Sequence, residues 1–309
     1  MLDRMAELNI PKLQALSTAD ARALVEALAQ SRSKDTKPPE MAEVETLSTG
    51  AGYGHVPVRI YRAMADRPAP VIMFYHGGGH VVGSLDSYDL TARHLARTAQ
   101  CTLVSVDYRM APEHPFPAAV EDSYDATRWV AEQADMLGVD PATLIVCGDS
   151  AGGNLAAVVA QMARDRGELA IAGQALIYPV TDYAGGTGSY DRYGEGYGVL
   201  ETATVQWFRN RYVPSAADLA DSRASPARAE TLEDLPPALV LTAECDVLRD
   251  EGAAYARALS AAGVPTDYVE YRGMVHGFFG YLGMVDDAAA AHATVAEFAR
   301  DIWQGGRRA

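Results

Sequence analysis

Several features that define large classes of protein are scarce in this chain of 309 residues. Cysteine occurs only three times, as Cys101, Cys147 and Cys245, without the spacing of a metal site. No apolar run reaches the roughly 18 residues that a membrane-spanning helix requires. Lys and Arg number 26 against 41 Asp and Glu, so the formal charge is −15. We therefore expect no metal, no membrane and no nucleic acid among its partners.

The cysteines and the N-terminal segment also bear on the cellular compartment. An odd number of cysteines in apolar, strand-like segments is typical of buried, reduced thiols. The opening segment, MLDRMAELNIPKLQALS, lacks the apolar core of a secretory signal peptide. Both observations predict a cytoplasmic protein.

What the chain does contain is an alternation of apolar runs and helical patterns. Apolar or alternating runs predict strands over 44–48, 56–61, 71–75, 102–106, 144–147, 175–178, 238–245 and 267–271. Helical patterns fall over 90–99, 117–136, 154–162, 252–262 and 286–303. This alternation predicts an α/β fold, with a mostly parallel central sheet of about eight strands flanked by helices.

The alternation is interrupted twice. A helical pattern with a capping signal at Ser17 precedes the first strand, and the segment after the sixth strand is rich in glycine and tyrosine, with one helical piece over 201–212. We expect residues 1–45 to form an N-terminal helical cap segment and residues 183–224 an inserted cap segment. The catalytic domain then comprises residues 46–182 and 225–309.

The stretch TLIVCGDSAGG, residues 143–153, is the centre of the functional argument. An apolar strand runs into Gly148-Asp149-Ser150-Ala151-Gly152, and a helical pattern follows. Strand, G-x-S-x-G turn and helix are the context of a nucleophile elbow, which presents the Ser150 hydroxyl beside a helix N-terminus. The alternative is a tight strand–helix turn in which Ser150 is an ordinary helix N-cap.

A second motif, His76-Gly77-Gly78-Gly79, directly follows the strand over 71–75. Consecutive glycines leave backbone N–H groups uncovered, and these groups together with that of Ala151 would form an oxyanion hole for acyl transfer. A nucleotide site is the rival interpretation, but neither G-K-[ST] nor G-x-G-x-x-G accompanies the glycines. The loop YRMAPEHPFPAA, residues 108–119, is interpreted as a scaffold for the glycine loop, with Glu113 and His114 as less favoured catalysts.

An acid and a base must complete the set. Asp246 ends the strand over 238–245, whereas Asp250 and Glu251 lie where a helix should begin and are explained by helix capping. His276 lies in the loop GMVHGFF beyond the last strand, and we expect His292, in an alanine-rich helix, to lie on a solvated face. The order Ser, acid, His is that of nucleophile-elbow hydrolases.

Together, HGGG, YRMAPEHPFPAA, GDSAGGN, DVLRDEG and GMVHGFF resemble the hormone-sensitive-lipase family of esterases, in its bacterial branch, within the α/β-hydrolase fold. The resemblance implies Ser150 as nucleophile, His276 as general base and acid, and Asp246 as the orienting carboxylate. It also implies three oxyanion donors, Gly78, Gly79 and Ala151, and a loop shaped by Gly77. Val247 departs from the family, which usually has proline after the acid.

The resemblance implies a carboxylic-ester hydrolase that acts on short- to medium-chain acyl esters without a metal or organic cofactor. Two alternatives are a non-catalytic ligand-binding protein on the same fold and a serine peptidase. A homodimer through the sheet edge near residues 267–271 is a further expectation by analogy. Cap aromatics would line an acyl pocket or form the cap's own core: Tyr183, Tyr190, Tyr193, Tyr197, Trp207, Phe208 and Tyr212.

Overall fold

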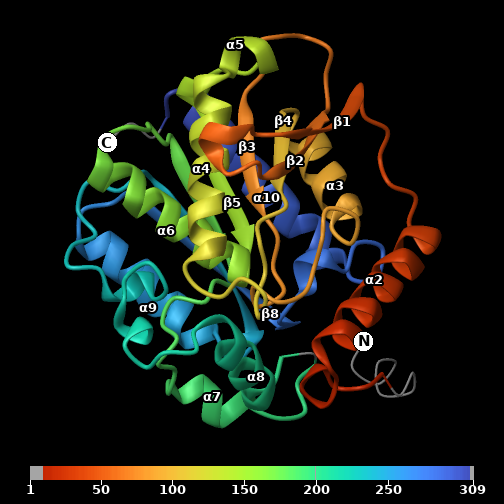
Figure 1. Ribbon diagram of the computed structural model, residues 1–309, viewed down its shortest axis with the longest axis vertical. Helices are drawn as coiled ribbons and strands as arrows, with labels where there is room; N and C mark the ends of the chain where they lie inside the picture. Colours follow the sequence, from red (N-terminus) through yellow and green to blue (C-terminus); the bar gives the residue numbers. More distant parts are fainter. Residues whose placement is uncertain (1–9, 199, 307–309) are drawn as a thin grey trace.

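The computed structural model describes residues 10–198 and 200–306. Within these ranges eight strands form one sheet in the order β1-β2-β4-β3-β5-β6-β7-β8 (Figure 1). Strands β3 to β8 are parallel, and β1 and β2 pair in antiparallel fashion at one edge. The strands are β1 Glu43–Ser48, β2 Pro57–Arg62, β3 Val71–Tyr75, β4 Thr102–Val106, β5 Ile145–Asp149, β6 Gly173–Ile177, β7 Ala238–Cys245 and β8 Thr266–Val275. The predicted fold class is confirmed.

Helices cover both faces of the sheet. One face packs against α3 (Asp89–Ala99) and α10 (Asp286–Trp303), and the other against α4 (Ala118–Glu132), α6 (Ala151–Arg166) and α9 (Arg249–Ala261). Successive side chains of β3 point to opposite faces of the sheet: Ile72 and Phe74 pack with the first layer of helices, and Met73 packs with the second. A strand that is buried on both faces therefore has a continuous apolar sequence.

Two further groups of helices lie near the carboxyl ends of the parallel strands (Figure 1). One is α2, Thr18–Asp35, near the N-terminus, and the other consists of α7, Gly188–Tyr193, and α8, Thr202–Tyr212. The groups touch through Lys12, whose Nζ lies 2.8 Å from a Glu201 carboxylate oxygen at the start of α8. Segments that are nearly 190 residues apart thus meet above the sheet edge where α/β sheets bind ligands.

Several predicted boundaries are wrong. The helix expected over 117–136 is divided at Gln133 into α4 and α5, Ala134–Leu137, and α6 begins at Ala151, immediately after the elbow serine. Strand β8 continues to Val275, and α7 was not expected, because its six residues include too few apolar positions to show a period. Short 3-10 helices occupy Leu13–Ala15, Ala51–Tyr53, Pro141–Thr143, Asp218–Ala220, Pro226–Arg228 and Phe278–Gly280.

Across residues 10–198 and 200–306, no helix has the length and apolarity to cross a membrane. All three thiols are free. Cys101 and Cys147 are buried as expected, but Cys245 is only half-buried because it lies where β7 leaves the sheet.

Candidate active site

The elbow is a strained turn between β5 and α6. Ser150 has φ 56° and ψ −117°, a conformation that non-glycine residues rarely adopt. Two glycines make the turn possible, since a Cβ on Gly152 would lie 1.9 Å from the carbonyl oxygen of Tyr75, and one on Gly148 would lie 2.3 Å from the Gly152 backbone. The Ser150 side chain makes no capping hydrogen bond, so the interpretation as an ordinary N-cap is wrong.

Three predicted side chains from distant elements meet at this turn. His276 Nε2 lies 2.9 Å from Ser150 Oγ, and His276 Nδ1 lies 2.7 Å from Asp246 Oδ2. Asp246 follows β7 and His276 follows β8, so parallel strands deliver both to the edge where β5 ends. All three residues are less than a tenth exposed, which shields their hydrogen bonds from water. The other Asp246 oxygen accepts a hydrogen bond from the Leu248 N–H at 3.0 Å.

The rival acids are engaged elsewhere. Asp250 pairs with Arg249 at 2.6 Å in the first turn of α9. Glu251 accepts a hydrogen bond from the Thr181 N–H at 2.8 Å, and burial raises the pKa of its carboxyl to about 8. Neither carboxylate therefore replaces Asp246 beside the imidazole.

The expectation that His292 lies on a solvated face is wrong. The side chain is fully buried and stacks on Phe279, with ring centroids 3.8 Å apart. Buried residues of α10 recur at 288, 291, 292, 295, 296 and 299, which is the period of one helical face. Four of the seven alanines of this helix, at 288, 291, 296 and 299, lie in this buried stripe, and its spacing could have located His292 in the core.

The glycine loop lies beside the elbow. Gly78 and Gly79 have φ values of 108° and 61°, which favour glycine. A Cβ on Gly78 would lie 2.1 Å from the Val82 carbonyl oxygen. Ala151 is the first residue of α6, so its N–H has no acceptor within the helix. The glycine loop thus lies against the end of β5, and the N-terminus of α6 directly follows Ser150.

The residues around the loop support it as expected of a scaffold. The Tyr108 hydroxyl donates to the carbonyl oxygen of His76 at 2.7 Å, and the two rings stack with centroids 4.4 Å apart. Glu113 pairs with Arg22 of α2 at 2.7 Å, and this contact turns its carboxylate away from catalysis. Burial lowers the pKa of His76 to about 4, so its ring is neutral at physiological pH.

Sequence reasoning assigned no role to Asp149, the residue before the nucleophile. Its carboxylate is buried and accepts hydrogen bonds from the Gly77 N–H at 2.9 Å and from the Tyr88 hydroxyl at 3.0 Å. Burial raises the pKa of this carboxyl to about 6. A charged residue inside an otherwise apolar strand was the available signal.

The cap aromatics are distributed unevenly around the site. Phe208 packs on the glycine loop. Its ring occupies the space that a side chain on Gly79 would need, since a Cβ there would lie 2.2 Å from the ring. Trp207 packs against Phe208 and under the Arg211 guanidinium. The Tyr190 hydroxyl lies 3.4 Å from Glu251, whereas Tyr197 is 38% exposed. Tyr183, Tyr193 and Tyr212 are buried.

In the part of the chain that the structure describes, no three His, Cys, Asp or Glu side chains are grouped as metal ligands would be.

Comparison with known proteins gives consistent results. The profile of a family described as alpha/beta hydrolase fold matches residues 72–280. An ethyl acetate hydrolase of Pseudomonas putida is 42% identical over 259 residues, which cover 82% of this chain and 81% of that protein. Carboxylesterase NlhH of Mycobacterium tuberculosis is 42% identical over 274 residues, covering 86% and 85%.

Solved structures agree with this relationship. An esterase from Pyrobaculum calidifontis superposes with a TM-score of 0.91 at 40% identity, covering 98% of this chain and 96% of that one. A thermostable carboxylesterase from a metagenomic library gives 0.89 at 40% identity, covering 93% and 98%. By its matched residues and its relatives, this chain belongs to the alpha/beta hydrolase fold family, in the hormone-sensitive-lipase-like branch that its motifs resemble.

Proposed function

We propose that this protein is a serine carboxylesterase that hydrolyses small-molecule esters through an acyl-enzyme intermediate. The observation that carries the proposal is the chain of hydrogen bonds from Asp246 through His276 to Ser150 at a strained elbow. The names of its relatives, which include an ethyl acetate hydrolase and carboxylesterases, support the same reaction class.

In the acylation half, Ser150 Oγ attacks the carbonyl carbon of the ester while His276 Nε2 accepts the hydroxyl proton. The carbonyl π electrons move to oxygen and give a tetrahedral oxyanion. Asp246 holds the Nδ1–H of His276 and stabilises the imidazolium. The oxyanion then collapses, the bond to the alcohol oxygen breaks, and Nε2 returns its proton to the leaving alcohol.

Deacylation repeats these steps with water. The neutral imidazole of His276 accepts a proton from water, whose oxygen attacks the acyl carbon. A second oxyanion collapses, the bond to Ser150 Oγ breaks, and the proton returns to the serine. The products are a carboxylic acid and an alcohol, and the enzyme is regenerated.

The backbone N–H groups of Gly78, Gly79 and Ala151 are the proposed oxyanion donors. Their support is the positive φ of the two glycines and the position of Ala151 at the N-terminus of α6. Such donors favour the tetrahedral state because its oxygen carries more charge than the ester carbonyl.

Short- to medium-chain acyl esters are the proposed substrates. The aromatic ring of Phe208 packs directly on Gly79, so it limits the space beside the glycine loop. Phe208, Trp207, Tyr183 and Tyr190 are therefore the favoured lining candidates, while the partly exposed Tyr197 is the weakest.

The proposed division of the chain follows the same arrangement. Of the proposed cap segments, 1–45 and 183–224, the structure describes 10–45, 183–198 and 200–224, and residues 43–45 already belong to β1. The proposed catalytic domain, 46–182 and 225–309, contains Ser150, Asp246 and His276. The free thiols are compatible with the proposed cytoplasmic location.

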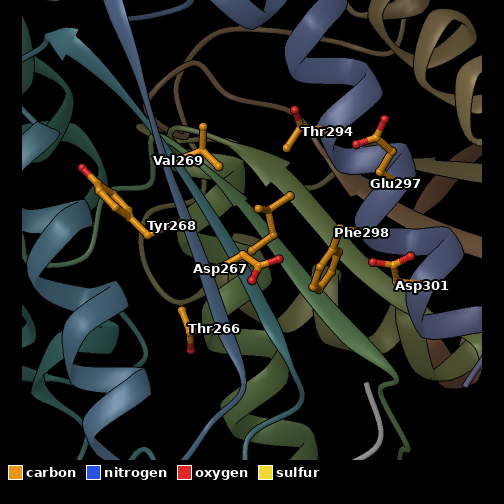
Figure 2. Close-up of a pocket in the computed structure, with 9 residues that line it drawn as sticks. Thr266, Asp267, Tyr268, Val269, Thr294, Glu297, Phe298 and Asp301 are labelled. Carbon is orange, nitrogen blue, oxygen red and sulfur yellow. The ribbon is translucent and has the colours of Figure 1, made fainter. Parts of the chain in front are cut away.

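A homodimer through β8 is also proposed. This strand is an edge of the sheet, and most of its residues are partly or fully exposed. A groove of about 430 Å³ lies here. Figure 2 shows residues that line it, with Thr294, Glu297 and Phe298 of α10 on one side and β8 on the other. Sedimentation of the purified protein tests this association.

A chain-length series of nitrophenyl esters tests the proposed activity. We expect hydrolysis to be fastest for acetyl to hexanoyl esters and Ser150→Ala to lower kcat at least about a thousandfold, because triad members act as a unit. An organophosphate should label wild-type protein stoichiometrically and leave the variant unlabelled. A wild-type protein that neither hydrolyses esters nor takes the label would be the inert ligand-binding alternative, and faster cleavage of peptides would indicate the peptidase.

A further inference from the structure

The carboxylate of Asp149 lies one residue before the elbow serine, and it contacts the glycine loop rather than the imidazole. Its Oδ1 accepts the Gly77 N–H at 2.9 Å. The approach is close, since a Cβ on Gly77 would lie 2.6 Å from Asp149 Oδ2. We propose that Asp149 is a positioning residue, which fixes the oxyanion loop against the nucleophile elbow and so sets the distance between the oxyanion donors and Ser150.

The second carboxylate oxygen extends this connection to two other elements. Asp149 Oδ2 accepts the Tyr88 hydroxyl at 3.0 Å, just before α3, and the Tyr178 hydroxyl at 3.4 Å, just after β6. The Tyr178 ring in turn lies 4.6 Å from the His276 ring, centroid to centroid. The Asp149 carboxylate thus links Gly77 of the glycine loop to the elbow and to Tyr178, whose ring packs against His276.

A neutral side chain could fill the same space, so the burial of a carboxylate requires a reason. Asp149 is only 5% exposed, and its surroundings contain no cation in direct contact among the described residues. Burying such a group costs free energy unless its hydrogen bonds are made, and charged acceptors hold N–H donors more strongly than neutral ones. The Gly77 amide therefore gains a stronger anchor than an amide or hydroxyl oxygen would provide.

The negative charge also acts on the general base. Asp149 and His276 interact electrostatically, and His276 becomes positively charged when it accepts the serine proton. The titratable groups that interact with Asp149 come from several elements: Cys147 on its own strand, Tyr88, Tyr108, Tyr178 and His276. The tyrosines and the cysteine are neutral at physiological pH, so His276 is the member whose charge changes during turnover.

Two variants separate the tether from the charge. Asp149→Ala removes both, and we expect kcat to fall about 100-fold with KM changed less than about threefold, because misplaced oxyanion donors act on the transition state. Asp149→Asn retains an oxygen for the Gly77 N–H but loses the charge. For this variant we expect a loss in kcat nearer about tenfold, because a neutral amide oxygen holds the Gly77 N–H less strongly than a carboxylate does.

Two readouts distinguish positioning from a merely structural role. A trifluoromethyl ketone forms a tetrahedral adduct on the serine, so Asp149→Ala should weaken its inhibition by the same factor as kcat/KM. Hydrogen exchange at residues 77–79 should become about tenfold faster in Asp149→Ala and increase by a smaller factor in Asp149→Asn. Asp122→Asn is the matched control, since Asp122 is a buried carboxylate on α4 that binds Arg109 at 2.8 Å. It should lower stability at most.

The outcomes are separable from those of the proposed function, on which the kinetic part of this inference rests. Folded Asp149→Ala with wild-type kcat, ketone inhibition and loop exchange would overturn the positioning role while wild-type esterase activity stands. If Asp149→Ala does not fold, Asp149→Asn decides, and an unchanged kcat in that variant overturns the proposal. A wild type without esterase activity would refute the proposed function, and loop exchange would still decide whether Asp149 holds the loop.

Discussion

The elbow and the inserted cap are built in opposite ways, although they lie against one another. At the elbow, backbone touches backbone: a Cβ on Gly152 would lie 1.9 Å from the Tyr75 carbonyl oxygen. In the cap, a Cβ on Gly186 would meet nothing within 4 Å. The elbow geometry is thus fixed by backbone contact with β3, whereas the cap has open space at Gly186, although not at Gly194, where a Cβ would lie 2.3 Å from the Tyr190 carbonyl oxygen.

The two regions also differ in how they are attached. Asn154, in the first turn of α6, donates to the carbonyl oxygens of Val180 and Ala224 at 2.9 and 2.8 Å. These residues lie where the insertion leaves and rejoins the catalytic domain. The cap is also held by an ion pair between the exposed Lys12 and the buried Glu201. From this difference we expect the catalytic geometry to depend on the sheet, and the choice of substrate to depend on the cap, which is anchored at its two ends.

The sharpest test compares a glycine from each region. Gly152→Ala must displace the Tyr75 carbonyl or the elbow itself, so we expect kcat/KM to fall at least about 100-fold, as displaced catalytic groups do. Gly186→Ala meets only the strain of its φ of 91° and should lower stability by about 1 kcal/mol without loss of kcat. Nitrophenyl ester kinetics and thermal melting measure both. Equal effects of the two changes would contradict the comparison.

The anchorage of the cap can be weakened at one side chain. Asn154→Ala leaves two buried carbonyl groups without their donor, so we expect a loss of roughly 2–4 kcal/mol of unfolding free energy. Limited proteolysis should cut more rapidly within 183–224, and KM should rise more than kcat falls.

Gln161→Ala is the matched control for that variant. Gln161 is a buried amide on the same helix, and it donates to the Pro226 carbonyl oxygen and the Tyr255 hydroxyl outside the insertion. It should lower stability to a similar extent without faster cleavage of the cap. Equal rates of cleavage within residues 183–224 in both variants would show that Asn154 does not anchor the insertion specifically.

A smaller effect is expected from the pH dependence of stability at Glu251. Burial raises the pKa of this carboxyl to about 8, above the value near 4.3 of an unfolded chain. The folded state therefore binds the proton more tightly, and the stability this gives at pH 4 is lost as pH rises towards 8. We expect Glu251→Gln to melt near the wild-type temperature at pH 5. At pH 8.5 it should melt at a higher temperature than wild type, with a free energy of unfolding greater by on the order of 2 kcal/mol.

Melting curves between pH 5 and 8.5 measure this difference. Glu230→Gln, at an exposed position, is the control that should follow the wild-type profile. A Glu251→Gln profile parallel to wild type would show that Glu251 keeps its charge in the fold.

The smallest effect is expected at the outer contact of the cap. Lys12 is 65% exposed, so its pair with Glu201 is largely screened by water. Lys12→Met should shift the melting temperature by less than about 2 °C at low salt and not at all in 0.5 M salt. A large, salt-independent shift would mean that this contact holds the cap as firmly as its two ends do.

The α/β fold could be predicted because buried parallel strands are apolar on both faces. The runs over 71–75 and 102–106 match β3 and β4 residue for residue. The boundaries of β8 and α6 could not be predicted. Strand β8 continues to Val275 through Gly273, a residue that usually ends strands, and α6 begins one residue after a serine whose backbone conformation depends on its tertiary contacts.

The candidate site shows the same division. Ser150, Asp246 and His276 were predicted from residue type, spacing and family resemblance, and the hydrogen bonds of the structure join them in the predicted order. Asp149 was overlooked because its partner, Gly77, lies 72 residues away. His292 was misplaced because composition was weighed above periodicity.

The sequence by itself determined which side chains reach the carboxyl ends of the strands, since the positions of the strands follow from local apolar patterns and the helices between them make the strands parallel. Only the tertiary structure decided which of those side chains touch, because contacts across 30 to 126 residues depend on packing between elements that no local pattern records. The apposition of Phe208 and Gly79, the burial of Asp149 and Glu251, and the attachment of the cap through Asn154 all belong to that second class.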